Sequence, residues 1–235
     1  MPKIKFTIIT LFEEAIRPYL ETSMMWKAAE KGIAEFDFVN LRDFGLGPHK
    51  SVDDTPYGGG DGMLLRCEPV FAAIESVKEK DPNAKVILPT PAGDLWTEAW
   101  ARELAGDEPA EASPLHYIIL CPHYEGYDER ILTIVDYKFS LGHYVLTGGE
   151  LPALIMIDSI VRLLPGVLGG ETSAEVESFS EDGIIEYPQY TKPRVFLDRE
   201  VPEILLCGDL LFPLERRMRL GDKIGCCHVD TQPLF

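Results

Sequence analysis

Short apolar runs rich in β-branched residues alternate along the chain with amphipathic stretches, and this alternation constrains the fold strongly. The apolar runs cover residues 6–10, 36–41, 85–89 and 117–121. The amphipathic stretches cover roughly residues 16–31, 69–80 and 96–105. Alternating strands and helices predict an α/β fold in which helices flank a parallel sheet and ligands gather at the carboxyl ends of the strands.

The domain organisation follows from length and from one change in composition. A chain of 235 residues can bury the core of one large domain with a small appendage. Residues 1–165 are expected to form the large domain, which ends in an apolar helix at residues 151–164. The polar, glycine-containing stretch 166–186 is typical of a flexible linker. Residues 187–235 are expected to form a small C-terminal domain with one short helix at 214–220.

Composition excludes several classes of protein. No apolar run reaches the ~20 residues that a membrane span requires, and the N-terminus lacks the features of a signal peptide. The five cysteines are odd in number and scattered, which favours free thiols in a reducing compartment. Cys226, Cys227 and His228 lack the paired spacing of a zinc site, so no metal site is predicted. We expect a cytoplasmic protein with no membrane partner.

Net charge argues against non-specific binding to nucleic acid. The formal charge is −17, whereas binding a polyanion normally requires clustered Lys and Arg that displace counterions. A local basic patch can still act in an acidic protein. The last fifth of the chain holds the candidates for one, Arg194, Arg199, Arg216, Arg217 and Arg219.

Three glycine-rich segments stand beside ionisable residues, at 54–63, 124–130 and 140–150. Glycine carries an entropic cost, so such clusters indicate close approach of the backbone to a ligand. None of them fits a Walker loop or a dinucleotide fingerprint, since the required Lys or the preceding strand is missing. The sequence therefore predicts ligand loops of another class.

These segments carry a resemblance to a known family. The blocks Asp-Thr-Pro-Tyr-Gly-Gly-Gly-Asp-Gly-Met (54–63), Tyr-Glu-Gly-Tyr-Asp-Glu-Arg (124–130) and Ser-Leu-Gly-His-Tyr-Val-Leu-Thr-Gly-Gly-Glu (140–150) occur in order, followed by Arg-Leu-Leu-Pro-Gly-Val-Leu (162–168). With these blocks the chain resembles the bacterial tRNA (guanine-37 N1)-methyltransferases of the SPOUT class over roughly residues 4–208. The resemblance implies S-adenosylmethionine as methyl donor and a tRNA anticodon loop as substrate.

The resemblance also implies a fold and a cofactor site. It implies a deep trefoil knot in the α/β domain, a truncated helical C-terminal domain, and a homodimer that shares its active site. The knot loops would hold the cofactor. The residues expected there are Thr90, Pro91, Gly93, Pro122, Tyr124, Glu125, Gly126, Leu141, Gly142, Tyr144, Leu146, Gly148, Gly149 and Glu186.

The chemistry needs one base and one cation. Guanine N1 is protonated at neutral pH, so methylation needs a group that removes this proton and a positive charge near O6. By position in the resemblance, Glu177 would be the base and Arg162 the cation. The target base must leave its stack. The residues expected on the RNA-facing rim are Asp53, Asp54, Tyr57, Gly58, Gly59 and Gly60.

The chain departs from the family pattern at several positions. Pro122 and His123 replace Gly-Arg, His143 replaces Asp, and Glu177 replaces a catalytic Asp. Two alternatives therefore stand beside the tRNA methyltransferase: a SPOUT methyltransferase with another RNA target, and a non-catalytic homologue that binds S-adenosylmethionine or RNA. The resemblance suggests a magnesium requirement, which the residues themselves do not indicate.

Overall fold

The computed structural model describes residues 3–106, 115–168, 178–179 and 188–206 of the chain. These residues fall within two compact units, Met1–Glu171 and Thr172–Phe235. The units are described separately below. The first of them contains the sheet and the pocket.

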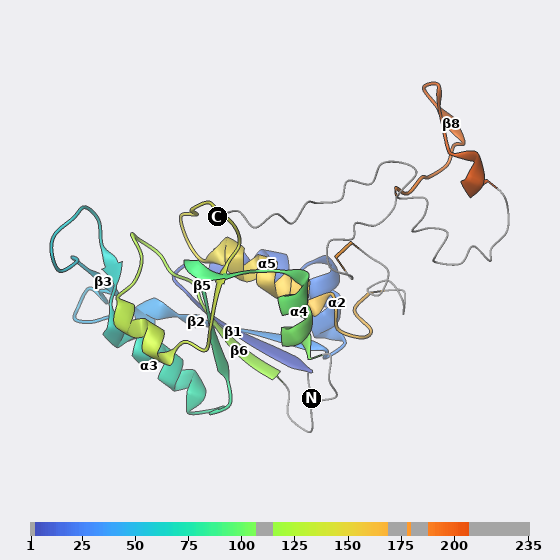
Figure 1. Ribbon diagram of the computed structural model, residues 1–235. Coiled ribbons are helices and arrows are strands. Elements are labelled where there is room, and N and C mark those ends of the chain that lie inside the picture. The colour runs from blue at the N-terminus through green and yellow to red at the C-terminus, as the bar shows by residue number, and fades with distance from the viewer. Residues whose placement is uncertain (1–2, 107–114, 169–177, 180–187, 207–235) are drawn as a thin grey trace. The chain divides into compact units, whose positions relative to one another are not determined.

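Five parallel strands form the sheet of the first unit (Figure 1). In chain order they are β1 (Ile4–Thr10), β2 (Ala34–Asn40), β5 (Lys85–Leu95), β6 (Leu115–Leu120) and β7 (Tyr137–Ser140). Their order across the sheet is β2-β1-β6-β5-β7, and every neighbouring pair is parallel. The predicted α/β class with a parallel sheet is confirmed.

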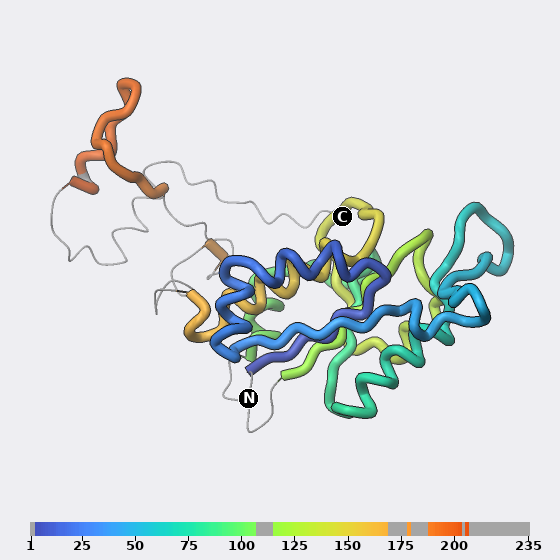
Figure 2. The backbone as a smooth tube through the Cα atoms, turned by 180° about the vertical axis from the view of Figure 1, so that it is seen from behind, coloured from blue at the N-terminus to red at the C-terminus, as the bar shows by residue number. Residues whose placement is uncertain are grey.

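Each face of the sheet has its own hydrophobic core, because successive side chains of a strand point to opposite faces. In β1, Phe6 and Ile8 enter one core and Ile9 enters the other. The first core is covered by α1 (Glu13–Leu20), α2 (Ser23–Glu30), α4 (Glu98–Ala105) and α5 (Glu150–Val161). The second is covered by α3 (Cys67–Lys78) and by the 3-10 helices η1 (Leu41–Phe44) and η2 (Glu129–Ile134). Figures 1 and 2 show these helical layers on either side of the sheet.

Helix α5 lies across the first face and is mostly buried. Its buried residues include Ala153, Met156 and Ile157, whereas Leu151 and Ile155 remain exposed. None of the helices within the described ranges combines the length and the hydrophobicity that a bilayer crossing demands.

The predicted helix at residues 16–31 is wrong in one respect, because two helices occupy this stretch. Thr22 adopts an extended backbone (φ −126°, ψ 158°) between α1 and α2. Its hydroxyl donates to the Tyr19 carbonyl over 2.9 Å, and its own carbonyl accepts from Trp26 N. Such local side-chain bonds compete with helical ones. The apolar residues keep a nearly helical spacing across the break, so the pattern does not reveal it.

Three short strands have too few residues to show an alternating pattern. β7 has four residues, and the antiparallel pair β3 (Asp53–Asp54) and β4 (Leu64–Leu65) has two each. None of these strands is among those predicted from the sequence.

Strand β5 is longer than the predicted 85–89 and contains an irregularity. Its pairing with β7 jumps from Pro89–Phe139 to Asp94–Phe139, so residues 90–93 leave the ladder. Gly93 makes this possible by close approach: a Cβ there would lie 2.5 Å from the carbonyl carbon of Lys138 and from the Phe139 nitrogen. The displaced residues begin the first loop of the pocket described below.

The described part of the second unit is small. β8 (Val195–Phe196) and β9 (Arg199–Glu200) form a hairpin whose turn residues, Leu197 and Asp198, both have positive φ. The 3-10 helix η3 (Glu203–Leu205) follows. The predicted helix at 214–220 and the arginines at 216, 217 and 219 lie outside the described residues.

The packing at Gly93 leads to a prediction about stability. Gly93→Ala is expected to lower the free energy of unfolding by about 1–3 kcal/mol, because the added methyl group would overlap the β7 backbone. Urea denaturation measures this change. Ala92→Ser, at an exposed neighbouring position, is the control and should change stability by less than about 0.5 kcal/mol. Equal effects of the two substitutions would contradict the packing argument.

Candidate active site

A pocket of about 180 Å³ lies at the carboxyl edge of the sheet, where the chain leaves β5, β6 and β7. Parallel strands bring their carboxyl ends to the same edge. The first pocket loop is the excursion of β5 at residues 90–93, the second follows β6 at 122–127, and the third follows β7 at 141–149; the three converge there. The pocket is lined by residues in and next to these segments: Pro89, Thr90, Pro91, Pro122, His123, Tyr124, Glu125, Gly126, Tyr127, Phe139, Ser140, Leu141, Gly142, Tyr144, Val145, Leu146, Thr147, Gly148, Gly149 and Pro152.

The pocket depends on direct backbone packing between two of these loops. The Gly149 N–H donates to the Pro122 carbonyl over 2.9 Å. A Cβ at Gly149 would overlap the Pro122 ring and lie 2.6 Å from the Cys121 Cα. Only glycine allows the chain entering α5 to lie this close to the end of β6.

The lining offers both apolar surface and a few polar groups. Pro91, Leu141 and Leu146 supply apolar walls, whereas Glu125 supplies a carboxylate. Thr90 is buried, and its hydroxyl accepts a hydrogen bond from the Tyr127 hydroxyl at 3.0 Å. Apolar walls with a small number of placed polar groups are typical of sites for small organic ligands.

Tyr124 occupies a special position in the second loop. Its backbone is left-handed (φ 63°), which is uncommon for a residue other than glycine. Burial raises the pKa of the Tyr124 phenol, and the nearby Asp53 carboxylate raises it further. Tyr124 therefore connects the pocket to β3, where the expected RNA rim begins.

The residues expected to bind the cofactor lie in this pocket, with two exceptions. Gly93 does not line it but packs against β7 behind it, and Glu186 lies outside the described residues. The pocket also includes residues that the sequence analysis did not select, among them His123, Tyr127 and Thr147. All three residues lie within or next to the glycine-rich segments 124–130 and 140–150, and this position in the sequence could have identified them.

The two residues expected to be catalytic are not brought together within the described chain. Glu177 lies outside the described residues. Arg162 caps the carboxyl end of α5, and its backbone N–H donates to the Asp158 carbonyl at 3.0 Å. The pocket lies at the other end of this 12-residue helix, about 18 Å away along its axis. Arg162 does not line the pocket.

The expected RNA rim is an exposed loop attached to the pocket by backbone hydrogen bonds. Tyr57 is fully exposed, and Gly58, Gly59 and Gly60 are exposed beside it. At the base of this loop, Glu125 N donates to the Met63 carbonyl at 3.0 Å. Further along, Leu65 N donates to the Gly126 carbonyl and Asp128 N donates to the Leu65 carbonyl, both at 2.9 Å. The loop and the second pocket loop therefore form one connected structure.

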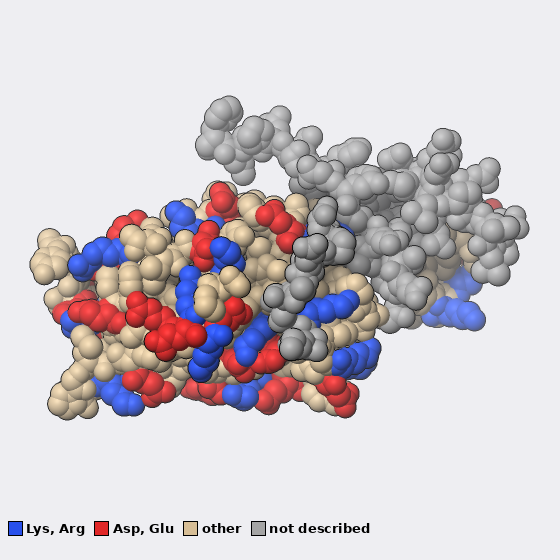
Figure 3. Space-filling model, turned by 90° about the horizontal axis from the view of Figure 1, so that it is seen from below, with Lys and Arg blue, Asp and Glu red and all other residues tan. Residues whose placement is uncertain are grey.

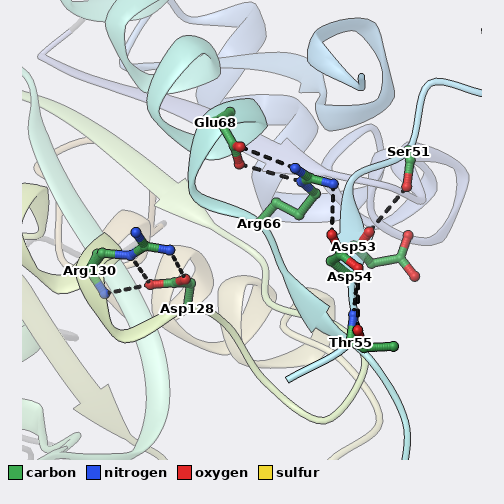
Figure 4. Close-up of polar contacts among 8 residues, drawn as sticks. All are labelled: Ser51, Asp53, Asp54, Thr55, Arg66, Glu68, Asp128 and Arg130. Atoms are coloured by element: carbon green, nitrogen blue, oxygen red, sulfur yellow. Dashed lines mark hydrogen bonds and ion pairs between the residues drawn. The ribbon is translucent and has the colours of Figure 1, made fainter. Parts of the chain in front are cut away.

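Arg66 stabilises the base of the rim through two carboxylates (Figure 4). Its Nη1 lies 2.9 Å from Asp54 Oδ2, and its Nη2 lies 3.1 Å from Glu68 Oε1. The hydrogen bond to Glu68 raises the pKa of Arg66, and the same contact lowers the pKa of Glu68. The permanent positive charge of Arg66 therefore lies close to both Asp53 and Asp54.

A second ion pair, between Asp128 and Arg130, lies at the end of the glycine-rich segment 124–130. Arg130 Nη2 lies 2.6 Å from Asp128 Oδ2, as Figure 4 shows, and holds the pKa of this carboxyl well below its usual range. Burial raises the pKa of the neighbouring Cys67 thiol to about 11, with a further contribution from Asp128. Cys67 is therefore protonated at neutral pH, which argues against a nucleophilic role.

Charge on the described surface is mixed. On the face of the first unit that Figure 3 shows, acidic and basic side chains are interspersed. No group of three or more His, Cys, Asp or Glu residues with a geometry suited to a metal occurs in the described ranges. The residues Cys226, Cys227 and His228 lie outside them.

Known proteins are similar to this chain over most of its length. Residues 4–214 match the family described as tRNA (guanine-1)-methyltransferase TrmD. A tRNA (guanine-N(1)-)-methyltransferase of Lacticaseibacillus paracasei is 49% identical over 207 residues, covering 88% of this chain and 78% of its own. The Geobacter sulfurreducens protein of the same name is 48% identical, with coverages of 88% and 81%.

A solved structure has the same fold. The crystal structure of the tRNA (m1G37) methyltransferase from Aquifex aeolicus superimposes with a TM-score of 0.75 at 34% identity, covering 95% of this chain and 92% of that one. Since the family match extends over most of the chain and identities near one half accompany it, the chain belongs to the tRNA (guanine-1)-methyltransferase family.

Proposed function

We propose that this enzyme transfers a methyl group from S-adenosylmethionine to N1 of the guanine at position 37 of tRNA, immediately 3′ of the anticodon. The observation that carries the proposal is the pocket formed by three converging loops in a chain of this family. Its relatives are named for methylation of guanine N1 in tRNA. A tRNA substrate would place the enzyme in the cytoplasm.

The lining of the pocket suits this cofactor. Leu141, Leu146 and Pro91 would contact the flat adenine, and the Glu125 carboxylate would pair with the amino group of the methionine part. Gly148 and Gly149 let the third loop pack directly against His123 and Pro122 at this wall, because a Cβ at either position would overlap those residues. When bound, S-adenosylmethionine supplies an electrophilic methyl group on a sulfonium.

Two side chains perform the acid–base and electrostatic work in this proposal. The Glu177 carboxylate accepts the N1 proton of guanine as the new N–CH₃ bond forms. The Arg162 guanidinium stabilises the negative charge that develops on O6. Together, these two groups would make guanine N1 nucleophilic beside the methyl group of the cofactor.

A homodimer would complete the site. Arg162 lies about 18 Å along α5 from the pocket of its own protomer, so a second copy could supply the missing cation. An exposed apolar face fits this arrangement: Leu151 and Ile155 lie one turn apart on α5, and Tyr19 of α1 donates to Asp158 beside them. Such contiguous apolar surface is typical of interfaces.

The finer features of the fold belong to the same proposal. The tight packing of Gly149 on Cys121 and Pro122 supports a knotted crossing of the chain before α5, a topology otherwise nearly absent from proteins. Residues 1–165, 166–186 and 187–235 would be the methyltransferase domain, linker and small C-terminal domain. A magnesium requirement, which the family resemblance suggests, belongs to the same proposal.

The activity is tested by methyl transfer from labelled S-adenosylmethionine to tRNA with guanine at position 37. We expect incorporation into this tRNA and none into a control in which adenine replaces that guanine, because only guanine presents the protonated N1. Cofactor binding without transfer would instead favour another RNA target or a binding-only protein. Absence of cofactor binding would contradict the proposal as a whole.

The role of Glu177 gives a second prediction. Glu177→Gln is expected to lower kcat by about a hundredfold or more, because an amide cannot accept the proton. Glu177→Asp keeps the carboxylate and should retain most of the activity. Single-turnover measurement at saturating tRNA and cofactor isolates this step. Unchanged turnover of Glu177→Gln would show that another group is the base.

The dimer gives a third prediction. Replacing Leu151 and Ile155 together by Asp should dissociate the dimer, because charged side chains would be buried at its centre. Sedimentation equilibrium should then report monomers that have lost methyl transfer but still fold. Glu75→Lys, on the exposed side of α3, is the control and should remain dimeric. A wild-type chain that is monomeric at micromolar concentration would contradict the shared site.

A further inference from the structure

A buried polar cluster lies directly behind the pocket and joins three parts of the chain. Glu150, the first residue of α5, is only 7% exposed. Its Oε1 accepts a hydrogen bond from the Thr10 hydroxyl of β1 at 2.6 Å. The His123 Nε2 lies 2.7 Å from Oε1 and 2.8 Å from Oε2 of the same carboxylate.

We propose that His123 and Glu150 are positioning residues for the cofactor, and that their pairing sets the spacing between the second and third loops of the pocket. This inference rests on the proposed function, since it takes the pocket to be the site of S-adenosylmethionine. Neither residue is assigned a contact with the reacting atoms. Their effect passes through the loops to which they belong.

The pairing is placed where it can control the pocket. His123 lines the pocket between Pro122 and Tyr124, and its ring lies against the third loop, where a Cβ at Gly148 would lie 2.5 Å from Cε1. Glu150 follows Gly149, whose N–H is bonded to the Pro122 carbonyl. The side-chain contact and the backbone bond therefore join the same two loops at adjacent residues.

The ring of His123 also contacts an aromatic side chain from the segment after β1. Phe12 packs against the imidazole edge to face, with ring centroids 4.9 Å apart. The Phe12 N–H donates to the Thr10 hydroxyl at 2.9 Å, and this hydroxyl donates to Glu150. The chain after β1 thereby fixes both members of the pair, which leaves little freedom for the carboxylate or the imidazole.

Burial makes the pair strongly dependent on both members. Among the described contacts of Glu150, only His123 can carry a positive charge. A buried carboxylate that loses its partner is destabilised more than a pair that is removed completely. Without the imidazole, the carboxylate is expected to move towards water and carry residues 148–150 with it, which would widen the pocket at the cofactor.

A second histidine offers a matched control on the same strands. His116 of β6 contacts the Thr7 hydroxyl of β1 through Nε2 and Asp81 Oδ2 through Nδ1, both at 2.9 Å. His116 is buried and contacts a threonine and a carboxylate directly, whereas the half-buried His123 contacts a carboxylate that itself accepts from a threonine. His116 lies near the amino end of β6, away from the edge that carries the pocket.

The experiment is a double-mutant cycle on the full-length protein, with cofactor affinity measured by calorimetry and kcat measured at saturating cofactor. His123→Ala should raise the Kd for S-adenosylmethionine by about tenfold to a hundredfold, with kcat changed less than about threefold. His123→Gln keeps an N–H donor and should recover part of the affinity. Adding Glu150→Gln to His123→Ala should also recover affinity, since it removes the buried charge.

The control separates positioning from general destabilisation. His116→Ala should lower the free energy of unfolding while leaving the Kd for S-adenosylmethionine unchanged. The inference is overturned if His123→Ala and His123→Gln bind the cofactor as wild type does, or if His116→Ala weakens binding equally. Failure of the wild-type protein to bind S-adenosylmethionine would overturn the proposed function itself, which is a different result.

Discussion

The packing of Gly149 against the end of β6 is the contact on which the candidate site depends. It allows the chain to enter α5 directly beside Cys121 and Pro122, and the Gly149–Pro122 hydrogen bond then joins two loops that are far apart in sequence. Gly93 has the same role between β5 and β7. Both contacts are between backbones, so the pocket wall is defined by chain path more than by side-chain size.

This construction brings the pocket and the exposed glycine loop into one connected structure. The segment that lines the pocket at Glu125 and Gly126 is hydrogen-bonded to Met63 and Leu65, at the base of the loop. Arg66 neutralises part of the acidic charge there by pairing with Asp54 and Glu68. In an acidic protein, such local compensation lowers the repulsion that an approaching phosphate backbone would meet.

Helix α5 separates the proposed cofactor pocket from the proposed catalytic cation, Arg162. Its amino end belongs to the pocket, through Gly149 and Pro152, whereas its carboxyl end carries Arg162. A rigid buried helix of this length cannot bring both ends to one ligand, so the separation is a consequence of the core packing around Met156 and Ile157. In the proposed homodimer, the second copy would supply Arg162 without any movement of the helix.

The sequence by itself determined the fold class, the order of the main elements and the residues of the pocket loops. Short apolar runs predict the strands at 6–10 and 117–121 because central strands of a parallel sheet are buried on both faces, and such a run is visible in the local sequence. Clustered glycines mark the loop within 140–150 because the backbone demands of glycine are local too. The family resemblance added chemistry that periodicity cannot supply.

Only the tertiary structure decided how these parts combine. The four-residue excursion of β5 and the pairing of β3 with β4 depend on contacts between separate segments. The His123–Glu150–Thr10 cluster joins residues separated by as many as 140 positions. No local pattern encodes such a contact, since its energy arises from burial and charge that exist only after the sheet and α5 have packed.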